Sequence, residues 1–129
     1  MSHHCMFEGI DTVIVRVRDI DAARAWYGEL LGCRESYGDA AAGIVVFECG
    51  GPTTVTLFAL GPGESAQPRA GGCWPVFRVR DAEGSHAELA SRGVAVDPLQ
   101  SDGTVRWFDF TDPEGNRLEA CEVLGAGWG

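Results

Sequence analysis

The sequence lacks a long apolar run, a surplus of basic residues and the shape of a signal peptide. No stretch approaches the roughly 20 apolar residues that a membrane-spanning helix requires, so we expect no membrane partner. Lys and Arg total 10 against 19 Asp and Glu, for a formal net charge of −9. Because nucleic-acid binding depends on Lys and Arg contacts to phosphates, we expect no nucleic-acid partner. Residues 1–5 have no apolar core, which favours a cytoplasmic location over secretion.

Paired-cysteine motifs are missing as well. The five cysteines are Cys5, Cys33, Cys49, Cys73 and Cys121, an odd number without a CxxC pair. This pattern is typical of reduced thiols in the cytoplasm. The spacings also argue against a zinc site built from cysteine.

Motifs of several large enzyme classes are absent. The sequence contains no GxSxG turn, which carries the serine nucleophile in many hydrolases. It contains neither a GxGxxG nor a GxxxxGK[ST] loop, the glycine-rich loops that hold the phosphates of nucleotides. Function must therefore be sought in other features.

The length and composition are those of one folded unit. The chain has 129 residues, of which 45% are hydrophobic and 22% charged. A chain of this size buries enough apolar surface for a single core, and its charge content is near the average for folded proteins. We expect one domain over residues 1–129.

The first half of the chain predicts a strand, a helix and three further strands. Residues 11–18 alternate apolar and polar side chains, as a half-buried strand does. Asp19 then offers an N-cap, apolar residues follow at helical spacing, and Gly32 is a natural stop. The three strand-like stretches cover residues 33–37, 44–49 and 54–60, with glycine-containing turns between them.

The second half predicts the same order of elements. Residues 61–72 are rich in Gly, Pro and small polar residues and are typical of a linker. A strand over residues 74–80, a cap at Asp81, a helix over 82–92 that ends at Gly93, and strands over 94–99, 105–111 and 117–123 follow. His86 lies on the helix stripe that faces the sheet, which indicates packing more than catalysis.

The repetition is the most informative feature of the sequence. The tripeptide VRD occurs at residues 17–19 and again 62 residues later, each time between a strand and a helix. An internal repeat of this size indicates two copies of one supersecondary unit. We therefore predict an α+β fold of two tandem βαβββ modules, module 1 over about residues 7–60 and module 2 over about 73–124. Each helix covers one face of its own sheet, which leaves the other face for a joint core or a cavity.

Two segments stand out: residues 15–32 (VRVRDIDAARAWYGELLG) at the first strand–helix junction, and Asp112–Glu119 (DPEGNRLE), which taken alone would be an ordinary turn. Together they resemble the vicinal oxygen chelate superfamily of glyoxalases, bleomycin resistance proteins and extradiol dioxygenases. The first segment is similar to the first half of such a domain, and the second to the DPxGNxxE signature before the last strand. The resemblance covers about residues 7–124. It implies a cup-like, partly open mixed β-barrel with the helices outside, and a homodimer.

The resemblance also implies where a metal would sit. Metal-dependent members place inward-facing ligands on the first and last strand of each module, and the matching positions here are Thr12, Thr56, Trp74 and Glu119. A catalytic divalent metal usually needs three His, Asp, Glu or Cys ligands, and only Glu119 qualifies. We therefore expect no metal or other cofactor. If a metal binds, it is an atypical divalent ion at Glu119, with Asp11 or Asp109 recruited by a different register.

Strand alternation extends the candidate site. If Thr56 faces inward, the same parity turns Phe58 inward on its strand, and Trp107 is a further aromatic candidate. The opposite parity is almost wholly apolar and should pack under the helices; it comprises Val13, Val15, Val17, Val55, Leu57, Phe77, Val79 and Leu118. The ligand-binding candidates are Thr12, Thr56, Phe58, Trp74, Trp107 and Glu119, an aromatic set with few polar groups that suits a small-molecule ligand.

Three functions remain open at this point. The leading hypothesis is a protein of the bleomycin-resistance kind that sequesters a small, partly aromatic or cationic molecule in a cup at or near a homodimer interface. An alternative is a lyase, isomerase or dioxygenase-like enzyme with Glu119 as general acid or base. The third is a structural or regulatory domain whose cup is plugged by its own aromatic residues, with Glu119 paired only to Arg16 or Arg78. Exposed sheet edges that need covering support the homodimer.

Overall fold

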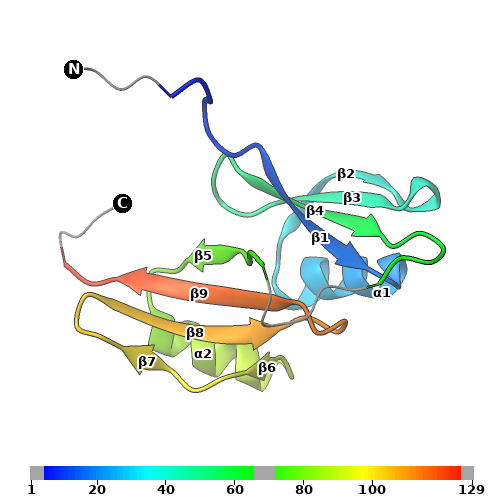
Figure 1. Ribbon diagram of the computed structural model, residues 1–129. Helices are drawn as coiled ribbons and strands as arrows, with labels where there is room; N and C mark the ends of the chain where they lie inside the picture. Colours follow the sequence, from blue (N-terminus) through cyan, green and yellow to red (C-terminus); the bar gives the residue numbers. More distant parts are fainter. Residues whose placement is uncertain (1–4, 66–71, 126–129) are drawn as a thin grey trace.

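The computed structural model describes residues 5–65 and 72–125, and each half of the chain forms one sheet with one principal helix (Figure 1). The first half contains β1 (Thr12–Val17), α1 (Ile20–Ala25), a π-helical turn η1 (Trp26–Leu30), β2 (Arg34–Asp39), a short 3₁₀ helix η2 (Ala40–Ala42), β3 (Ile44–Glu48) and β4 (Thr54–Ala59). The second half contains β5 (Val76–Arg78), α2 (Ala82–Ser91), β6 (Ala95–Val96), β7 (Gln100–Ser101), β8 (Val105–Thr111) and β9 (Arg117–Val123). The α+β class is confirmed, and no closed barrel forms within the described residues.

The two sheets have equivalent strand orders, which confirms the repeat. The first sheet runs β1-β4-β3-β2 and the second β5-β9-β8-β6, with β7 also pairing with β8. In each sheet the first strand lies at the edge and runs parallel to the last. The register matches as well, because Ile14 pairs with Thr56 and Val76 pairs with Glu119. The repeat therefore holds at the level of individual residue pairs.

Both helices begin where the sequence predicts; α1 continues as the π-helical turn η1 to Leu30, and α2 ends at Ser91, one residue before its predicted end. The Asp19 carboxylate accepts a hydrogen bond from the Ala22 N–H at 3.0 Å, and the Asp81 carboxylate accepts one from Gly84 at 3.1 Å. These caps satisfy backbone donors that the first helical turn leaves free. After the helices, Gly32 and Gly93 adopt φ of 74° and 86°, the left-handed conformation that terminates a helix at little cost for glycine.

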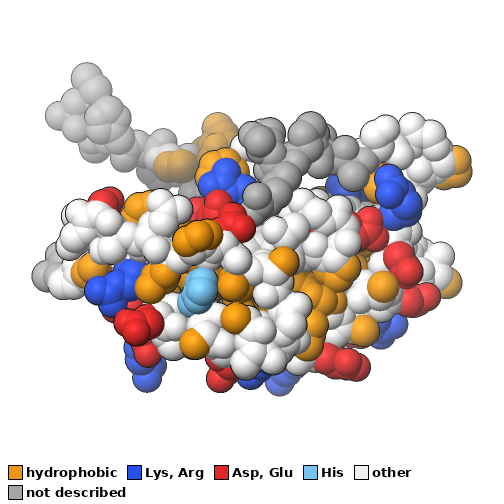
Figure 2. All heavy atoms as spheres, turned by 90° about the horizontal axis from the view of Figure 1, so that it is seen from below, with side chains coloured by type: hydrophobic (Ala, Val, Ile, Leu, Met, Phe, Trp, Pro, Cys, Tyr) orange, Lys and Arg blue, Asp and Glu red, His pale blue; other side chains and the backbone are white. Residues whose placement is uncertain are grey.

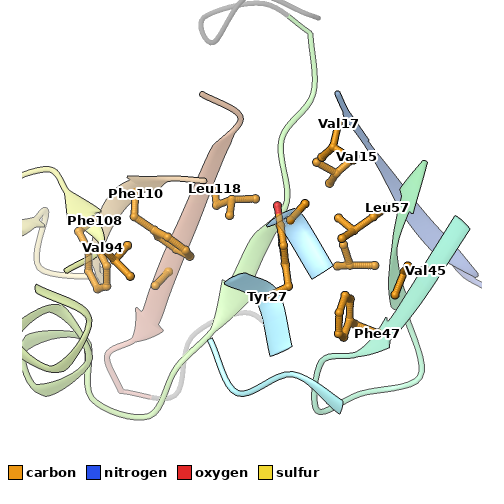
Figure 3. Close-up of a cluster of buried hydrophobic side chains, with 13 residues drawn as sticks. Val15, Val17, Tyr27, Val45, Phe47, Leu57, Val94, Phe108, Phe110 and Leu118 are labelled. Atoms are coloured by element: carbon orange, nitrogen blue, oxygen red, sulfur yellow. The ribbon is translucent and has the colours of Figure 1, made fainter. Parts of the chain in front are cut away.

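A cluster of buried apolar side chains draws on both halves (Figure 3). It contains Val15, Val17, Ala23, Tyr27, Val45, Phe47, Val55, Leu57, Val94, Phe108, Phe110, Leu118 and Ala120. These side chains come from the helices and from the sheet faces that the helices cover, so the predicted parity is correct. Joint packing of the two halves therefore occurs on the helix side of the sheets.

Tyr27 lies between the two halves of this cluster (Figure 3). It is fully buried in the π-helical turn and stacks on Phe47, with ring centroids 6.0 Å apart. Its hydroxyl donates to the Asp112 carboxylate at 2.9 Å. Burial and the neighbouring carboxylate raise the pKa of Tyr27 well above its usual value. The hydroxyl therefore stays protonated and serves as a donor between the modules.

The DPEGN turn proves to be more than an ordinary turn. One oxygen of the buried Asp112 carboxylate accepts hydrogen bonds from the backbone N–H groups of Glu114 and Asn116, both at 2.9 Å. The Asn116 side chain donates across to the Arg16 carbonyl at 3.1 Å. Together with the hydrogen bond from Tyr27, these contacts attach the turn of module 2 to module 1.

Two predicted strands are shorter than the sequence indicated. The strand expected over residues 74–80 is regular only at β5, although backbone hydrogen bonds from Glu119 to the Pro75 carbonyl and from Val79 to Cys121 extend the pairing. Of the strand expected over 94–99, only β6 forms, and β7 lies beyond its predicted end. Pro98 lies between them and has no N–H to donate, so it interrupts the ladder.

The region between β2 and β3 also differs from the prediction. Strand β2 continues through the expected turn at Gly38, and the short helix η2 makes the reversal instead. The Asp39 carboxylate caps η2 by accepting from Ala42 at 3.2 Å, and Gly43 then adopts φ of 77°. Half of the predicted linker falls on residues 66–71, which lie outside the described residues. No helix among the described residues has the length and apolar character to cross a bilayer.

Candidate ligand-binding site

The side of each sheet that faces away from its helix carries the predicted site, and we call it the cup face. On the edge strands, Ile14 and Val76 occupy equivalent cup-face positions and are 54% and 53% exposed. Phe58, also on the cup face, is 38% exposed. Apolar side chains of this size are usually buried or functional when they cluster at a surface. Both cup faces are therefore open in the single chain.

In module 1 the cup face is lined by hydroxyl groups. Thr12 Oγ1 donates to the Thr54 carbonyl at 3.1 Å and lies 2.7 Å from Thr56 Oγ1. Because the Thr12 hydroxyl donates its one proton to the Thr54 carbonyl, the Thr56 hydroxyl is the donor in the hydrogen bond between the two threonines. Thr56 is buried. The two positions that carry metal ligands in metal-dependent relatives thus hold two hydroxyls that satisfy each other.

Arg16 closes one end of this face. Its guanidinium lies 4.9 Å from the centroid of the Phe58 ring and donates to the Glu64 carboxylate at 2.8 and 3.2 Å. The arginine holds the pKa of Glu64 below its usual value. The predicted alternative that Arg16 pairs with Glu119 is therefore wrong.

In module 2 the cup face is charged and aromatic. Trp74 Nε1 donates to Glu119 Oε1 at 3.1 Å. The Arg117 guanidinium stacks 3.5 Å from the centroid of the Trp74 ring and pairs with the Asp109 carboxylate at 2.9 Å. Glu119 makes no contact with Arg78 among the interactions found between described residues. Its second oxygen has no protein partner in the described part of the chain.

Asp109 and Arg117 also carry unused hydrogen-bonding capacity. Asp109 Oδ1 and Arg117 Nε are buried but have no hydrogen-bond partner among the described residues. An unpaired buried polar atom costs free energy, and such atoms are uncommon in folded proteins. Sequence reasoning treated Asp109 only as an alternative metal ligand. Asp109 lies on β8 directly opposite Glu119 of β9, and this position is the signal that places it in this cluster.

Trp107 lies at the far end of the same face. It is paired across the strands with Cys121, two residues beyond Glu119, so both share the cup face. Cys121 is largely buried, and burial raises the pKa of its thiol. His86, by contrast, is on the helix side: its Nε2 is 2.8 Å from the Asp97 carbonyl and its ring packs edge-on against Phe108. The packing interpretation of His86 is confirmed.

The structure places the predicted site residues in two separate groups. Thr12, Thr56 and Phe58 lie on the first sheet, whereas Trp74, Trp107 and Glu119 belong to the second half. No hydrogen bond, ion pair or ring contact found among the described residues joins one group to the other. Within residues 5–65 and 72–125, no group of three or more His, Cys, Asp and Glu side chains is arranged to hold a metal ion. The expectation of no cofactor remains a prediction.

A cavity of about 400 Å³ lies between the modules and reaches the cup-face residue Val76. We call it the inter-module cavity. Its walls are the β3–β4 loop over residues 49–54, the helix-side residues Val13 and Val55, and residues 75–78 at β5. The sequence indicated only a turn at Gly50–Pro52. No local pattern reveals this cavity, because its walls come from both halves of the chain.

The face seen from below carries side chains of both charge signs (Figure 2). Figure 2 shows apolar side chains near the middle of the face seen from below, with acidic and basic side chains around them. Arginines are interspersed with carboxylates, as in the pairs Arg24–Glu35, Arg34–Glu48 and Arg92–Glu88. This mixture does not resemble the continuous basic surface of nucleic-acid-binding proteins.

Two βαβββ modules with open cup faces define the class of protein, and solved structures share this fold. A glyoxalase family protein from Bacillus anthracis matches with a TM-score of 0.77 and 27% identity over 95% of this chain and 100% of that chain. An antibiotic binding protein from a Streptomyces species matches with a TM-score of 0.77 and 23% identity, over 94% of this chain and 100% of that chain. A lactoylglutathione lyase from Agrobacterium tumefaciens matches with a TM-score of 0.73 and 18% identity, over 92% of this chain and 96% of that chain.

The sequence itself assigns the family. The family model described as Glyoxalase/Bleomycin resistance protein/Dioxygenase superfamily matches residues 9–120. The chain therefore belongs to this superfamily, and the predicted resemblance is confirmed. A comparison with curated protein sequences finds no match.

Proposed function

We propose that this protein binds and sequesters a small, partly aromatic or cationic molecule on its cup faces, without a metal ion, in the manner of a bleomycin-resistance protein. One observation carries the proposal: Trp74 lies on an open sheet face with its indole N–H on Glu119 and its ring against Arg117. An aromatic surface with a few fixed polar groups is the usual composition of a small-molecule site. The similarity in fold to an antibiotic binding protein points the same way.

The charges on this face favour a cationic group in the ligand. Asp109 and Arg117 neutralise each other, which leaves the charge of Glu119 without a cationic partner among the described residues. A cation near the free oxygen of Glu119 would gain a charge-assisted hydrogen bond. A flat ring system of the ligand would contact the exposed parts of Trp74 and Phe58.

The proposed assembly is a homodimer in which module 1 of one copy faces module 2 of the other. Each cup face is half of a site, and the two halves in one chain lie on separate sheets. The edge strands β1 and β5 carry the exposed Ile14 and Val76, so each has both an open edge and an apolar face to cover. Pairing two copies brings hydroxyl-lined and charged faces together.

The experiment is a binding titration with a matched pair of probes. N-methylacridinium is a planar aromatic cation, and acridine is its neutral counterpart above the acridine pKa. N-methylacridinium should quench the tryptophan fluorescence of the wild-type protein at a lower concentration than acridine does. Glu119→Gln should weaken the binding of N-methylacridinium about tenfold, because the ion pair with the carboxylate is lost, and should leave the binding of acridine unchanged.

Glu88→Gln is the control, because Glu88 pairs with Arg92 on helix α2, away from the cup faces. It should bind both probes as the wild type does. Equal affinity of wild type and Glu119→Gln for N-methylacridinium would disprove a role of Glu119 in cation binding. The enzyme alternative is tested by the same variant, since an acid or base at Glu119 predicts a loss of turnover with no loss of probe binding.

A further inference from the structure

Cys33 and Cys49 form a thiol pair outside the cup faces. Cys33 immediately precedes β2 and Cys49 immediately follows β3. The antiparallel register pairs Arg34 with Glu48, so the next pair along is Cys33 opposite Cys49. Their sulfur atoms are 4.0 Å apart and share a thiol–thiol hydrogen bond. The register that the chain adopts thus brings together two cysteines that are 16 residues apart in the sequence.

The backbone geometry of such a pair suits a disulfide. Directly opposed residues in an antiparallel ladder have Cα atoms about 4.5–5.5 Å apart. Disulfides span Cα separations of about 4.4–6.8 Å, with their side chains directed toward each other. Because the sulfurs already face each other, a bond requires side-chain rotation but no change of strand register.

The two thiols differ in acidity. Hydrogen bonding by the Cys33 thiol stabilises the Cys49 thiolate and lowers the pKa of Cys49, against the opposing effect of burial. The same interaction, together with burial, raises the pKa of Cys33. Since the thiolate is the nucleophile in thiol–disulfide exchange, Cys49 is the attacking residue and Cys33 the resolving one.

Cys49 is also accessible to a small reagent. It lines the inter-module cavity next to the Gly50–Pro52 loop, and both thiols of the pair are only partly buried. Of the other cysteines, Cys121 is buried, and Cys5 and Cys73 are exposed without a sulfur neighbour among the described contacts. The Cys33–Cys49 pair is therefore distinct in having both a partner sulfur and a route from solvent.

We propose that Cys33 and Cys49 are a dithiol–disulfide site that reacts with low-molecular-weight disulfides through Cys49. The Cys49 thiolate attacks one sulfur of the reagent, a mixed disulfide forms, and the first thiolate leaves. The Cys33 sulfur then attacks Cys49, and the second thiolate of the reagent leaves. Each departing thiolate takes up one of the two protein thiol protons. The protein dithiol is oxidised by two electrons, and one reagent disulfide is reduced to two thiols.

The bond would act on the junction between the modules. The Cys33 N–H donates to the Tyr27 carbonyl at 3.1 Å, and the Tyr27 hydroxyl holds Asp112 of module 2. Cys49 forms part of the cavity wall. Oxidation would therefore fix the hairpin of β2 and β3 at the point where the cavity and the module junction meet. Closing a loop of this length should raise the Tm by about 5–10 °C.

The test treats the full chain, first in a Cys5→Ser/Cys73→Ser background, with glutathione disulfide under native conditions. The intact mass should fall by two hydrogens, and a peptide map should contain a Cys33–Cys49 link. Cys33→Ser should stop at one bound glutathione on Cys49, because the resolving thiol is gone. Cys49→Ser should react at Cys33 at least tenfold more slowly.

Three results would overturn the proposal. One is a wild-type product with separate glutathiones and no internal link. Another is equal reactivity of Cys33 and Cys49 in the two single variants. The third is a link whose formation leaves the Tm unchanged, which would remove the effect on the module junction. Cys121→Ser is the matched control and should form the Cys33–Cys49 link at the wild-type rate.

Discussion

The two halves of the molecule share a backbone plan and differ in the chemistry of their cup faces. Ile14 opposite Thr56 matches Val76 opposite Glu119, so the strand registers are equivalent. In module 1 the potential ligand positions hold the Thr12–Thr56 hydroxyl pair. In module 2 they hold the Trp74–Glu119 pair. The repeated fold therefore conserves packing on the helix side and leaves the cup faces free to diverge, because only the helix side contributes to the shared core.

The junction between the modules is the first feature to test, because each half contributes a different residue to it: Tyr27 from module 1 and Asp112 from module 2. Asp112→Ala should lower the free energy of unfolding by about 3 kcal/mol, because it removes the acceptor of several buried donors, among them the Tyr27 hydroxyl. Urea denaturation followed by circular dichroism measures the loss. The control is Asp102→Ala, which removes only an exposed turn contact to Thr104 and Val105. Equal losses in the two variants would contradict the special role of Asp112.

The edge strands provide a symmetric test of the proposed dimer. Ile14→Glu and Val76→Glu place a charge at equivalent exposed positions on β1 and β5. If these faces meet in a homodimer, each variant should weaken association by about thirtyfold or more, since a buried unpaired charge is costly. Light scattering over a concentration series measures this. Ala87→Glu, at an exposed position of helix α2 and away from the cup faces, should leave association unchanged. A strictly monomeric wild type would rule out the assembly.

Thr12 and Trp74 occupy equivalent positions and separate a ligand site from a plugged cup. Trp74→Ala should weaken the binding of N-methylacridinium about tenfold, because stacking on an aromatic ring contributes about 1 kcal/mol or somewhat more. Thr12→Ala should change affinity less than twofold. Urea titrations of the same variants provide the comparison. If Trp74 only fills the cup, Trp74→Ala should instead destabilise the fold by about 3–5 kcal/mol with no change in probe affinity.

The smallest expected effect concerns how each helix contacts its own sheet. In module 1 Arg24 donates to the Glu35 carboxylate at 2.7 and 2.6 Å, whereas in module 2 the equivalent residue His86 contacts the Asp97 carbonyl. Hydrogen bonding to Arg24 lowers the pKa of Glu35. The pair therefore stabilises the fold above the unfolded pKa of Glu35, and this stabilisation is lost as pH falls through the lower folded value.

Glu35→Gln should accordingly lower the Tm slightly at neutral pH, and the difference from wild type should vanish in acid. The effect is small because both side chains are exposed to solvent, which screens the ion pair. Thermal melts at a series of pH values measure it. Glu29→Gln, on the same helical segment, is the control. A difference that persists unchanged at low pH would mean that Glu35 acts through packing and not through its charge.

Local patterns predicted much of the fold and part of the site. The caps Asp19 and Asp81 were evident because they depend on residues within one helical turn. The first and last residues of β8 and β9 were predicted correctly, since both strands have regular alternation and clear turns. Pro98 interrupts the ladder of the strand expected over residues 94–99, an effect that its missing N–H makes visible in the sequence.

The candidate site was predictable only as a set of facing residues. Alternation assigned Thr56, Phe58 and Glu119 to one side of their strands, because side chains alternate with a period of two. It did not show that Trp74 contacts Arg117 as well as Glu119, nor that Asp109 pairs with Arg117. These contacts depend on side-chain conformations and on the pairing of β8 with β9, which no local pattern contains.

Residue type and short-range spacing are enough to predict the repeat, the helix caps and the apolar side of each strand, and the resemblance added the shortage of metal ligands at Thr12, Thr56 and Trp74. Tertiary contacts decide that the two halves pack together on the helix side, that Asp112 joins the modules and that Cys33 meets Cys49. These features arise from contacts between residues far apart in the chain. Such contacts follow from how whole sheets and helices bury their apolar faces together.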